Sequence, residues 1–362
     1  MIRLGDFKIT DEQRQIVSDI LDSTRITENK YVKLFEEETS KFLNVSNVIA
    51  VSNGTVALQL VAQYLKFYNN CNTVCIPATT FPATLNAFYV LGYNVILCDI
   101  DPETLCIDID TLSEQDKERI DVIVPVSLLG YTPDMNKIKD SAMKYGWIVV
   151  EDFAESFGSI YDGKKLGSIG DFGCSSFYVS HVLQGGELGI VTTNNKPVAK
   201  ILRSMKNHGR VGKSLEFNHA YIGSNFKTTE FTAGLCYSQM KNADTHIKKR
   251  QSNAEYLFEN INKSQLIPFP TSKNYSHLGY PIRAKHPIMK KAVCDYLELN
   301  GVETRGMFPC LARQQAYFGM FDYNKYPNSV MIEDTCFYIP VHQYLSNENL
   351  THIVRVINEA QK

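Results

Sequence analysis

Short runs of apolar residues recur through the first two hundred residues, and most are continuous rather than alternating. Continuous runs of this length are typical of strands buried on both faces of a sheet. Stretches with helical periodicity lie between several of them, for example 55–68 and 135–146. This succession predicts a mostly parallel sheet with right-handed crossovers. The seven runs begin at Asn47, Thr73, Asn94, Val122, Trp147, Cys174 and Leu188.

The pattern changes near residue 228, where one long helical stretch begins and continues to about residue 261. A strand-like segment near Tyr280, a helical segment over 289–301 and a final helix after Ser346 follow. We therefore expect an α/β protein with two domains. A large domain over residues 1–245 holds the mostly parallel seven-stranded sheet, and a smaller C-terminal α+β domain covers residues 246–362.

Composition excludes several classes of protein. The 362 residues are 44% apolar, enough for a sizeable core, and 37 basic residues balance 39 acidic ones without a basic block, so nucleic acid is not an expected partner. No apolar leader or membrane-length run is visible, and we expect a soluble, cytoplasmic protein. The nine cysteines lie mostly within apolar runs, like reduced core thiols, and no metal site is expected.

Ligands of such sheets bind beyond the carboxyl ends of the strands, and three segments place chemistry there. In the first, Gly54 and Thr55 lie between a strand and a helix. The free N–H groups and positive end of that helix, together with the Thr55 hydroxyl, favour a phosphate group. The alternative is an ordinary helix-capping turn.

The second segment is the carboxylate pair Glu151 and Asp152, which ends the apolar run 147–152. A carboxylate at this position can pair with a cationic ring nitrogen and keep a pyridine protonated. The alternative is a cap for a helix that starts after Phe153.

The third segment runs from Ser175 to Thr193. In it a predicted strand leads to Ser176 and then to His181, and a turn with glycines follows. An imidazole with a pKa of about 6.5 can take and return protons at physiological pH. A structural histidine is the alternative. Each of the three signals is unspecific alone, but their order and spacing together are specific.

Eight sequence blocks in this order resemble the DegT/StrS-type sugar-nucleotide aminotransferases, which are fold-type I enzymes that use pyridoxal phosphate (PLP). The resemblance extends from about Ile26 to the C-terminus, and VVEDFAESFGS and GDFGCSSFYVSH are two of its blocks. The full set covers residues 35–58, 76–104, 122–135, 149–159, 170–181, 205–210, 222–235 and 301–309.

This resemblance implies roles for individual residues. Gly54 and Thr55 are expected to bind the cofactor phosphate with help from Ser176. Phe81 is expected to stack on the pyridine ring, and Asp152 is expected to pair with the ring nitrogen.

Three further residues take their expected roles from the same resemblance. Glu155 stands where a glutamine or histidine usually approaches the phenolic oxygen of the cofactor. Asn225 resembles the residue that reaches the cofactor phosphate of the neighbouring subunit, which implies a homodimer with composite active sites. His208 lies in a loop that corresponds to one near the sugar pocket, although a surface histidine is an equal alternative.

The informative departure from the family is His181. The aminotransferases carry a lysine five residues after the Ser176 position and six before the glutamate that matches Glu187, and this chain has histidine there. An imidazole can carry protons but cannot hold the cofactor covalently. The same replacement marks a small branch of the family, the sugar-nucleotide C-3 dehydratases, such as GDP-4-keto-6-deoxymannose 3-dehydratase.

The resemblance therefore implies C-3 dehydration of a nucleotide-linked 4-keto-6-deoxy sugar, with glutamate as the amino donor that converts PLP to pyridoxamine phosphate (PMP). The cysteines form no quartet like that of the CDP-sugar branch, so no iron–sulfur partner is expected and GDP is the preferred nucleotide. The alternatives are an aminotransferase that tolerates histidine and a non-catalytic protein that binds PLP or a sugar nucleotide. Retention of Asp152, Ser176 and Asn225 argues against the non-catalytic protein.

Overall fold

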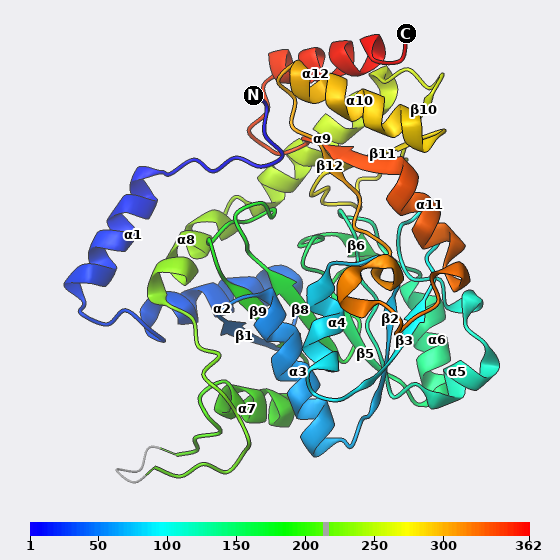
Figure 1. Cartoon of the computed structure of the whole chain (residues 1–362). Helices are drawn as coiled ribbons and strands as arrows, with labels where there is room; N and C mark the ends of the chain where they lie inside the picture. Colours follow the sequence, from blue (N-terminus) through cyan, green and yellow to red (C-terminus); the bar gives the residue numbers. More distant parts are fainter. Residues whose placement is uncertain (213–216) are drawn as a thin grey trace.

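A seven-stranded sheet forms the centre of the chain in the computed structural model, which describes residues 1–212 and 217–362 (Figure 1). Its order is β1-β9-β8-β5-β4-β2-β3, and only the pairs that include β9 are antiparallel. The seven strands are β1 (Asn47–Val51), β2 (Thr73–Pro77), β3 (Asn94–Cys98), β4 (Val122–Ile123), β5 (Ile148–Asp152), β8 (Phe172–Ser176) and β9 (Gly189–Thr193). The predicted mostly parallel seven-stranded sheet is confirmed.

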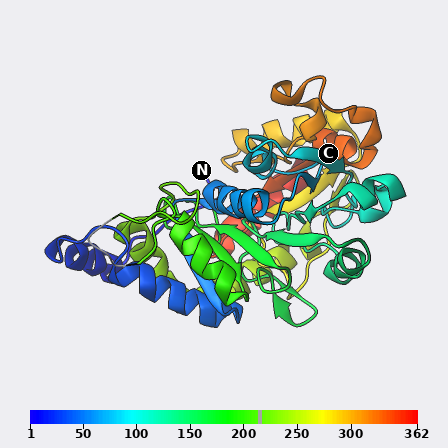
Figure 2. The same cartoon turned by 90° about the horizontal axis from the view of Figure 1, so that it is seen from below.

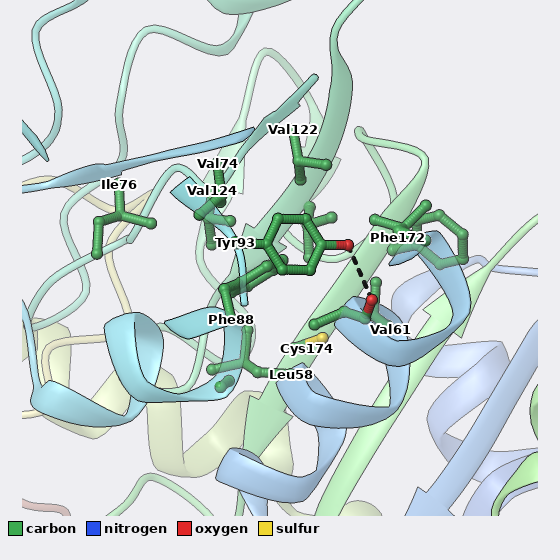
Figure 3. Packing of buried hydrophobic residues seen from close by; sticks show 14 of the residues in the cluster. Leu58, Val61, Val74, Ile76, Phe88, Tyr93, Val122, Val124, Phe172 and Cys174 are labelled. Carbon is green, nitrogen blue, oxygen red and sulfur yellow. Dashed lines mark hydrogen bonds between the residues drawn. The ribbon is translucent and has the colours of Figure 1, made fainter. Parts of the chain in front are cut away.

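Both faces of this sheet are buried, as the continuous apolar runs require. Val74 and Ile76 join the core formed with helices α3, α4 and α7, whereas Cys75 between them joins the core on the opposite face with α6. Figure 3 shows the first core, in which the Tyr93 hydroxyl donates to the Ala62 carbonyl over 2.9 Å. The helices around the sheet are α2 (Lys30–Leu43), α3 (Gly54–Tyr68), α4 (Pro82–Tyr89), α5 (Glu114–Arg119), α6 (Met135–Tyr145) and α7 (Lys196–Met205).

A second, four-stranded antiparallel sheet lies in the C-terminal part, with the order β10-β11-β13-β12. Its strands are β10 (Leu266–Pro268), β11 (Tyr280–Ala284), β12 (Arg305–Gly306) and β13 (Cys336–Ile339). Helices α9 (Ala243–Asn260), α10 (Pro287–Leu299) and α12 (Asn347–Glu359) pack against it around a separate hydrophobic core (Figure 1). The remaining elements are α1 (Asp11–Asp22), α11 (Pro327–Thr335), the hairpin β6 (Ile160–Tyr161) and β7 (Lys164–Lys165), and short 3-10 turns at Ile109–Thr111, Leu311–Arg313, Gln315–Tyr317 and Tyr323–Lys325.

The long helix expected from residue 228 is two helices, α8 (Glu230–Met240) and α9. The break at residues 241–242 lets α8 pack on α1 and α2 while α9 turns toward the smaller sheet (Figures 1 and 2). Tertiary packing therefore interrupts a stretch whose local pattern is helical throughout. The predicted division at residue 245 falls in the first turn of α9, and it stays a proposal.

Among the described residues, every helix is too short or too polar to cross a membrane. All nine cysteines are free thiols, and eight of them are buried. No group of three or more His, Cys, Asp or Glu side chains in residues 1–212 and 217–362 is arranged to hold a metal ion.

Candidate active site

The turn between β1 and α3 brings the chain close to the end of β8. Asn53 caps α3, because its side chain accepts a hydrogen bond from the Val56 N–H over 2.9 Å. Gly54 is buried, and a Cβ atom there would lie 2.7 Å from the Cβ of Ser176, so only glycine fits. The described hydrogen bonds leave the Thr55 hydroxyl unused, and together with the helix N-terminus it can bind a phosphate.

Asp152 ends β5 as a buried carboxylate, only 5% exposed. It accepts hydrogen bonds from the Thr84 hydroxyl (2.8 Å) and the Ala154 N–H (3.2 Å). Burial raises its pKa, since within the described residues no ion pair balances the carboxylate. A protonated ring nitrogen would supply the missing positive charge. The alternative of a helix cap is wrong, because turns and not a helix follow Phe153.

The neighbouring Glu151 has a structural task. Its buried carboxylate accepts hydrogen bonds from the backbone N–H groups of Gly167, Ile169 and Gly170 over 2.7 to 2.8 Å. These bonds anchor the loop that leads into β8. The two adjacent carboxylates therefore point to opposite sides of the strand and do different work.

Helix α4 links Asp152 to an exposed aromatic ring. Phe81 is the residue before Pro82 at the start of α4, and Thr84 in the first turn donates to Asp152. The Phe81 side chain is 57% exposed and packs against Phe308 with 5.7 Å between ring centroids. An exposed ring on the helix that contacts the buried carboxylate can provide a flat surface for a pyridine.

Glu155 lies three residues beyond Asp152 and is 9% exposed. One carboxylate oxygen accepts the Leu129 N–H over 2.9 Å. Burial, with a smaller contribution from Asp152, raises the pKa of Glu155 to about 7, against the opposing effects of the Leu129 N–H and Arg305. A substantial fraction of Glu155 is therefore protonated near neutral pH, and that form can donate a hydrogen bond to a phenolic oxygen.

His181 follows β8 in a tight turn, with its backbone N–H donating to the Tyr178 carbonyl over 2.9 Å. Its Nδ1 lies 2.9 Å from the Ser176 carbonyl oxygen. Because a carbonyl can only accept, Nδ1 carries the proton and Nε2 keeps its lone pair. Burial and the charge of Arg250 lower the pKa of His181 to about 4, against the opposing effect of Ser176, so the ring is neutral at physiological pH.

Two of the predicted residues lie outside this group of contacts. His208 and Asn225 are both exposed, on neighbouring segments joined by a bridge between Asn207 and Asn225. The carbonyl of Phe226 accepts the Ser52 N–H over 3.0 Å, which places this segment beside the turn before Gly54. The expected contacts of His208 with the sugar and of Asn225 with a partner's cofactor stay predictions.

Contacts and strand pairing connect four of the remaining predicted residues, namely Gly54, Ser176, His181 and Asp152. Gly54 touches Ser176, whose carbonyl holds His181. Asp152 pairs with Cys174 in the register of β5 and β8, two residues before Ser176. Sequence reasoning missed Thr84, although its position three residues after Phe81, in the first turn of α4, is a signal that could have identified it.

Comparison with known proteins agrees with this geometry. Residues 8–358 match the DegT/DnrJ/EryC1/StrS aminotransferase family. GDP-perosamine synthase of Escherichia coli O157:H7 is 29% identical over 354 residues, which cover 97% of this chain and 96% of that protein.

Two solved structures share the fold. A Streptococcus pneumoniae protein described as a sugar aminotransferase, in its PMP form, has a TM-score of 0.92 at 22% identity and covers 98% of this chain and 96% of its own. A variant of GDP-4-keto-6-deoxymannose-3-dehydratase (ColD) with bound GDP-perosamine has a TM-score of 0.92 at 22% identity, over 99% of this chain and 100% of its own.

The residues described above fit a phosphorylated pyridine: the turn before α3 suits the phosphate and the unbalanced Asp152 suits a ring cation. The pneumococcal structure is described as a PMP form, so a protein with this fold binds such a group. With the match over residues 8–358, the chain belongs to the DegT/DnrJ/EryC1/StrS aminotransferase family.

Proposed function

We propose that this protein is a sugar-nucleotide C-3 dehydratase, which converts a nucleotide-linked 4-keto-6-deoxy sugar to a 4-keto-3,6-dideoxy sugar. Glutamate is the amino donor that converts PLP to PMP. In the net reaction the sugar loses its C3 oxygen, and glutamate becomes 2-oxoglutarate and ammonia, so atoms and electrons balance. The observation that carries the proposal is His181, a neutral imidazole held by Ser176 at the position of the family's lysine.

The chain's own residues would hold the cofactor. Gly54 and Thr55, with the Ser176 hydroxyl, would bind its phosphate. Asp152 would hold the ring nitrogen protonated, and Glu155 would donate to the phenolic oxygen. When bound, the cofactor supplies an electron sink and, as PMP, the amine that reacts with the sugar ketone.

His181 supplies the proton transfer. Its Nδ1 is fixed by the Ser176 carbonyl, so Nε2 is the atom that accepts a proton and later returns it. A lysine would recapture the cofactor and favour transfer of nitrogen to the sugar, whereas histidine leaves the cofactor free. The nitrogen then leaves as ammonia.

The second candidate is an aminotransferase. The family as a whole and the relationship to GDP-perosamine synthase favour it. His181 argues against it, because the chain then lacks the amine at the position where the family carries its lysine. We further propose a homodimer in which Asn225, exposed in the single chain, reaches the cofactor phosphate of the partner.

The half-reaction with glutamate separates these possibilities. The purified protein is mixed with PLP and glutamate, its absorbance is followed, and a parallel sample is first treated with borohydride. A dehydratase converts PLP to PMP and shows no cofactor fixed to a lysine. His181→Asn, which removes the proton carrier, should abolish the conversion while PLP still binds. Absence of any half-reaction in the unaltered protein would favour a binding protein.

A further inference from the structure

Arg250 is a fully buried arginine on α9 whose guanidinium lies close to no acidic group among the described residues. Its Nε donates to the Gln343 side-chain oxygen over 2.7 Å. Its Nη1 donates to the carbonyls of His277 (2.9 Å) and Leu278 (3.0 Å), while Nη2 has no partner in the described part of the chain. A buried cation without a carboxylate is unfavourable for folding, so a role in the site would explain its retention.

These hydrogen bonds lead to one side of the candidate site. Leu278, whose carbonyl Arg250 binds, donates its N–H to the Leu129 carbonyl over 3.2 Å. Leu129 in turn donates its own N–H to Glu155 over 2.9 Å. The two loops are in tight contact, since a Cβ atom on Gly130 would lie 2.5 Å from the His277 nitrogen. Three hydrogen bonds therefore connect the guanidinium to the Glu155 carboxylate.

The positive charge of Arg250 also contributes to the lowered pKa values of several histidines. Burial is the main cause of the lowered pKa of His181, and Arg250 adds to it. Burial lowers the pKa of His246, His277 and His342, which come from α9 and from two separate loops, and the charge of Arg250 lowers each of them further. Burial lowers the pKa of Arg250 itself to about 9, against the opposing effect of Tyr344. The region thus combines one cation with neutral imidazoles.

We propose that Arg250 is a positioning residue: the hydrogen bonds of its guanidinium tie helix α9 of the smaller sheet to the loop that holds Glu155. The guanidinium fork holds the loop behind Glu155 in place. The positive charge discourages a second cation on His181 and so keeps Nε2 able to accept a proton. This inference rests on the proposed role of Glu155 beside the phenolic oxygen of the cofactor.

Two substitutions separate the hydrogen bonds from the charge. Arg250→Lys keeps the charge but loses the planar fork, and Arg250→Met removes both at similar length. Asn253→Leu is a matched control, because Asn253 lies one turn further along α9, is equally buried, and donates to the carbonyls of Val341 and His342. If Arg250→Met does not fold, Arg250→Gln is used in its place.

The assay uses the cofactor-free protein and so does not depend on its activity. Diethyl pyrocarbonate reacts with an imidazole only when the ring is neutral. The rate of modification of His181 is measured against pH by peptide mass spectrometry. Arg250→Met should move the midpoint upward by roughly half a pH unit, whereas Arg250→Lys and Asn253→Leu should leave it in place. Amide exchange at Leu129 should accelerate at least about tenfold in both Arg250 variants but not in Asn253→Leu.

Unchanged exchange at Leu129 in the Arg250 variants, or equal acceleration there in Asn253→Leu, would overturn the inference. If the midpoint and exchange behave as expected but no sugar is dehydrated, the linkage stands and the proposed function fails. If the sugar is dehydrated but neither readout moves, the proposed function stands without this role for Arg250.

Discussion

Gly54→Ala tests the contact on which the phosphate end of the site depends. The added carbon would lie 2.7 Å from the Cβ of Ser176, whereas ordinary contacts begin at 3.4 Å. Both residues lie where α3 and β8 meet, so relief requires backbone movement. Overpacking of this kind lowers the free energy of unfolding by about 1–3 kcal/mol. Replacing glycine also reduces the entropy of the unfolded chain, which raises the free energy of unfolding by about 0.4–1 kcal/mol. We expect a net loss of about 1–2 kcal/mol in the free energy of unfolding.

The matched variants at Ser176 show whether this contact is the cause. Ser176→Gly removes the carbon that clashes and should restore most of the stability of the Gly54→Ala protein, while Ser176→Ala keeps that carbon and should not. Stability is measured by urea unfolding. PLP affinity is measured by fluorescence titration of Gly54→Ala and of the unaltered protein. PLP affinity should fall at least about tenfold in Gly54→Ala, because the turn that faces the phosphate moves. Equal stability of Gly54→Ala and the unaltered protein, or rescue by Ser176→Ala, would refute the reasoning.

Two other predictions follow from the buried carboxylates. The pKa of Glu155 rises from an ordinary 4.5 to about 7 on folding, so the folded state binds the proton more tightly and stability falls as pH rises between these values, by up to about 3 kcal/mol. Urea unfolding at pH 5 and pH 8 should show this loss in the unaltered protein but not in Glu155→Gln, and an equal loss in both would contradict it. Asp152→Asn cannot balance a ring cation and should slow the half-reaction with glutamate roughly 100-fold. Thr84→Val keeps the charge of Asp152 but removes one hydrogen bond to it. If Thr84→Val slowed the half-reaction as much as Asp152→Asn, the charge of Asp152 would not be the cause of the slower rate.

The large sheet was predictable because its strands are buried on both faces and each forms a continuous apolar run. The apolar run that begins at Val122 continues to Leu129 in the sequence, yet β4 covers only Val122–Ile123, because pairing with its neighbours ends there. The break between α8 and α9 was not predictable, since it depends on where each helix packs. Local pattern thus predicted the number of strands in the large sheet but not the lengths of all elements, and it indicated only β11 of the four strands in the smaller sheet.

The site was predictable only where its residues follow strand ends. Asp152, Ser176 and His181 stand at or just beyond such ends, and the contact of Gly54 with Ser176 agrees with their expected common task. Arg250 could not be found in this way, because its hydrogen bonds reach residues 27 to 93 positions away. A lone arginine in a charged helical stretch gives no local signal of burial.

The fate of the donor nitrogen tests the central claim most directly. The protein is incubated with PLP, nitrogen-15-labelled glutamate and a panel of GDP-, CDP- and dTDP-linked 4-keto-6-deoxy sugars, and the products are analysed by mass spectrometry. If His181 carries protons without holding the cofactor, the label appears as free ammonium, one for each 3,6-dideoxy sugar formed. Label retained in an amino sugar would contradict the account.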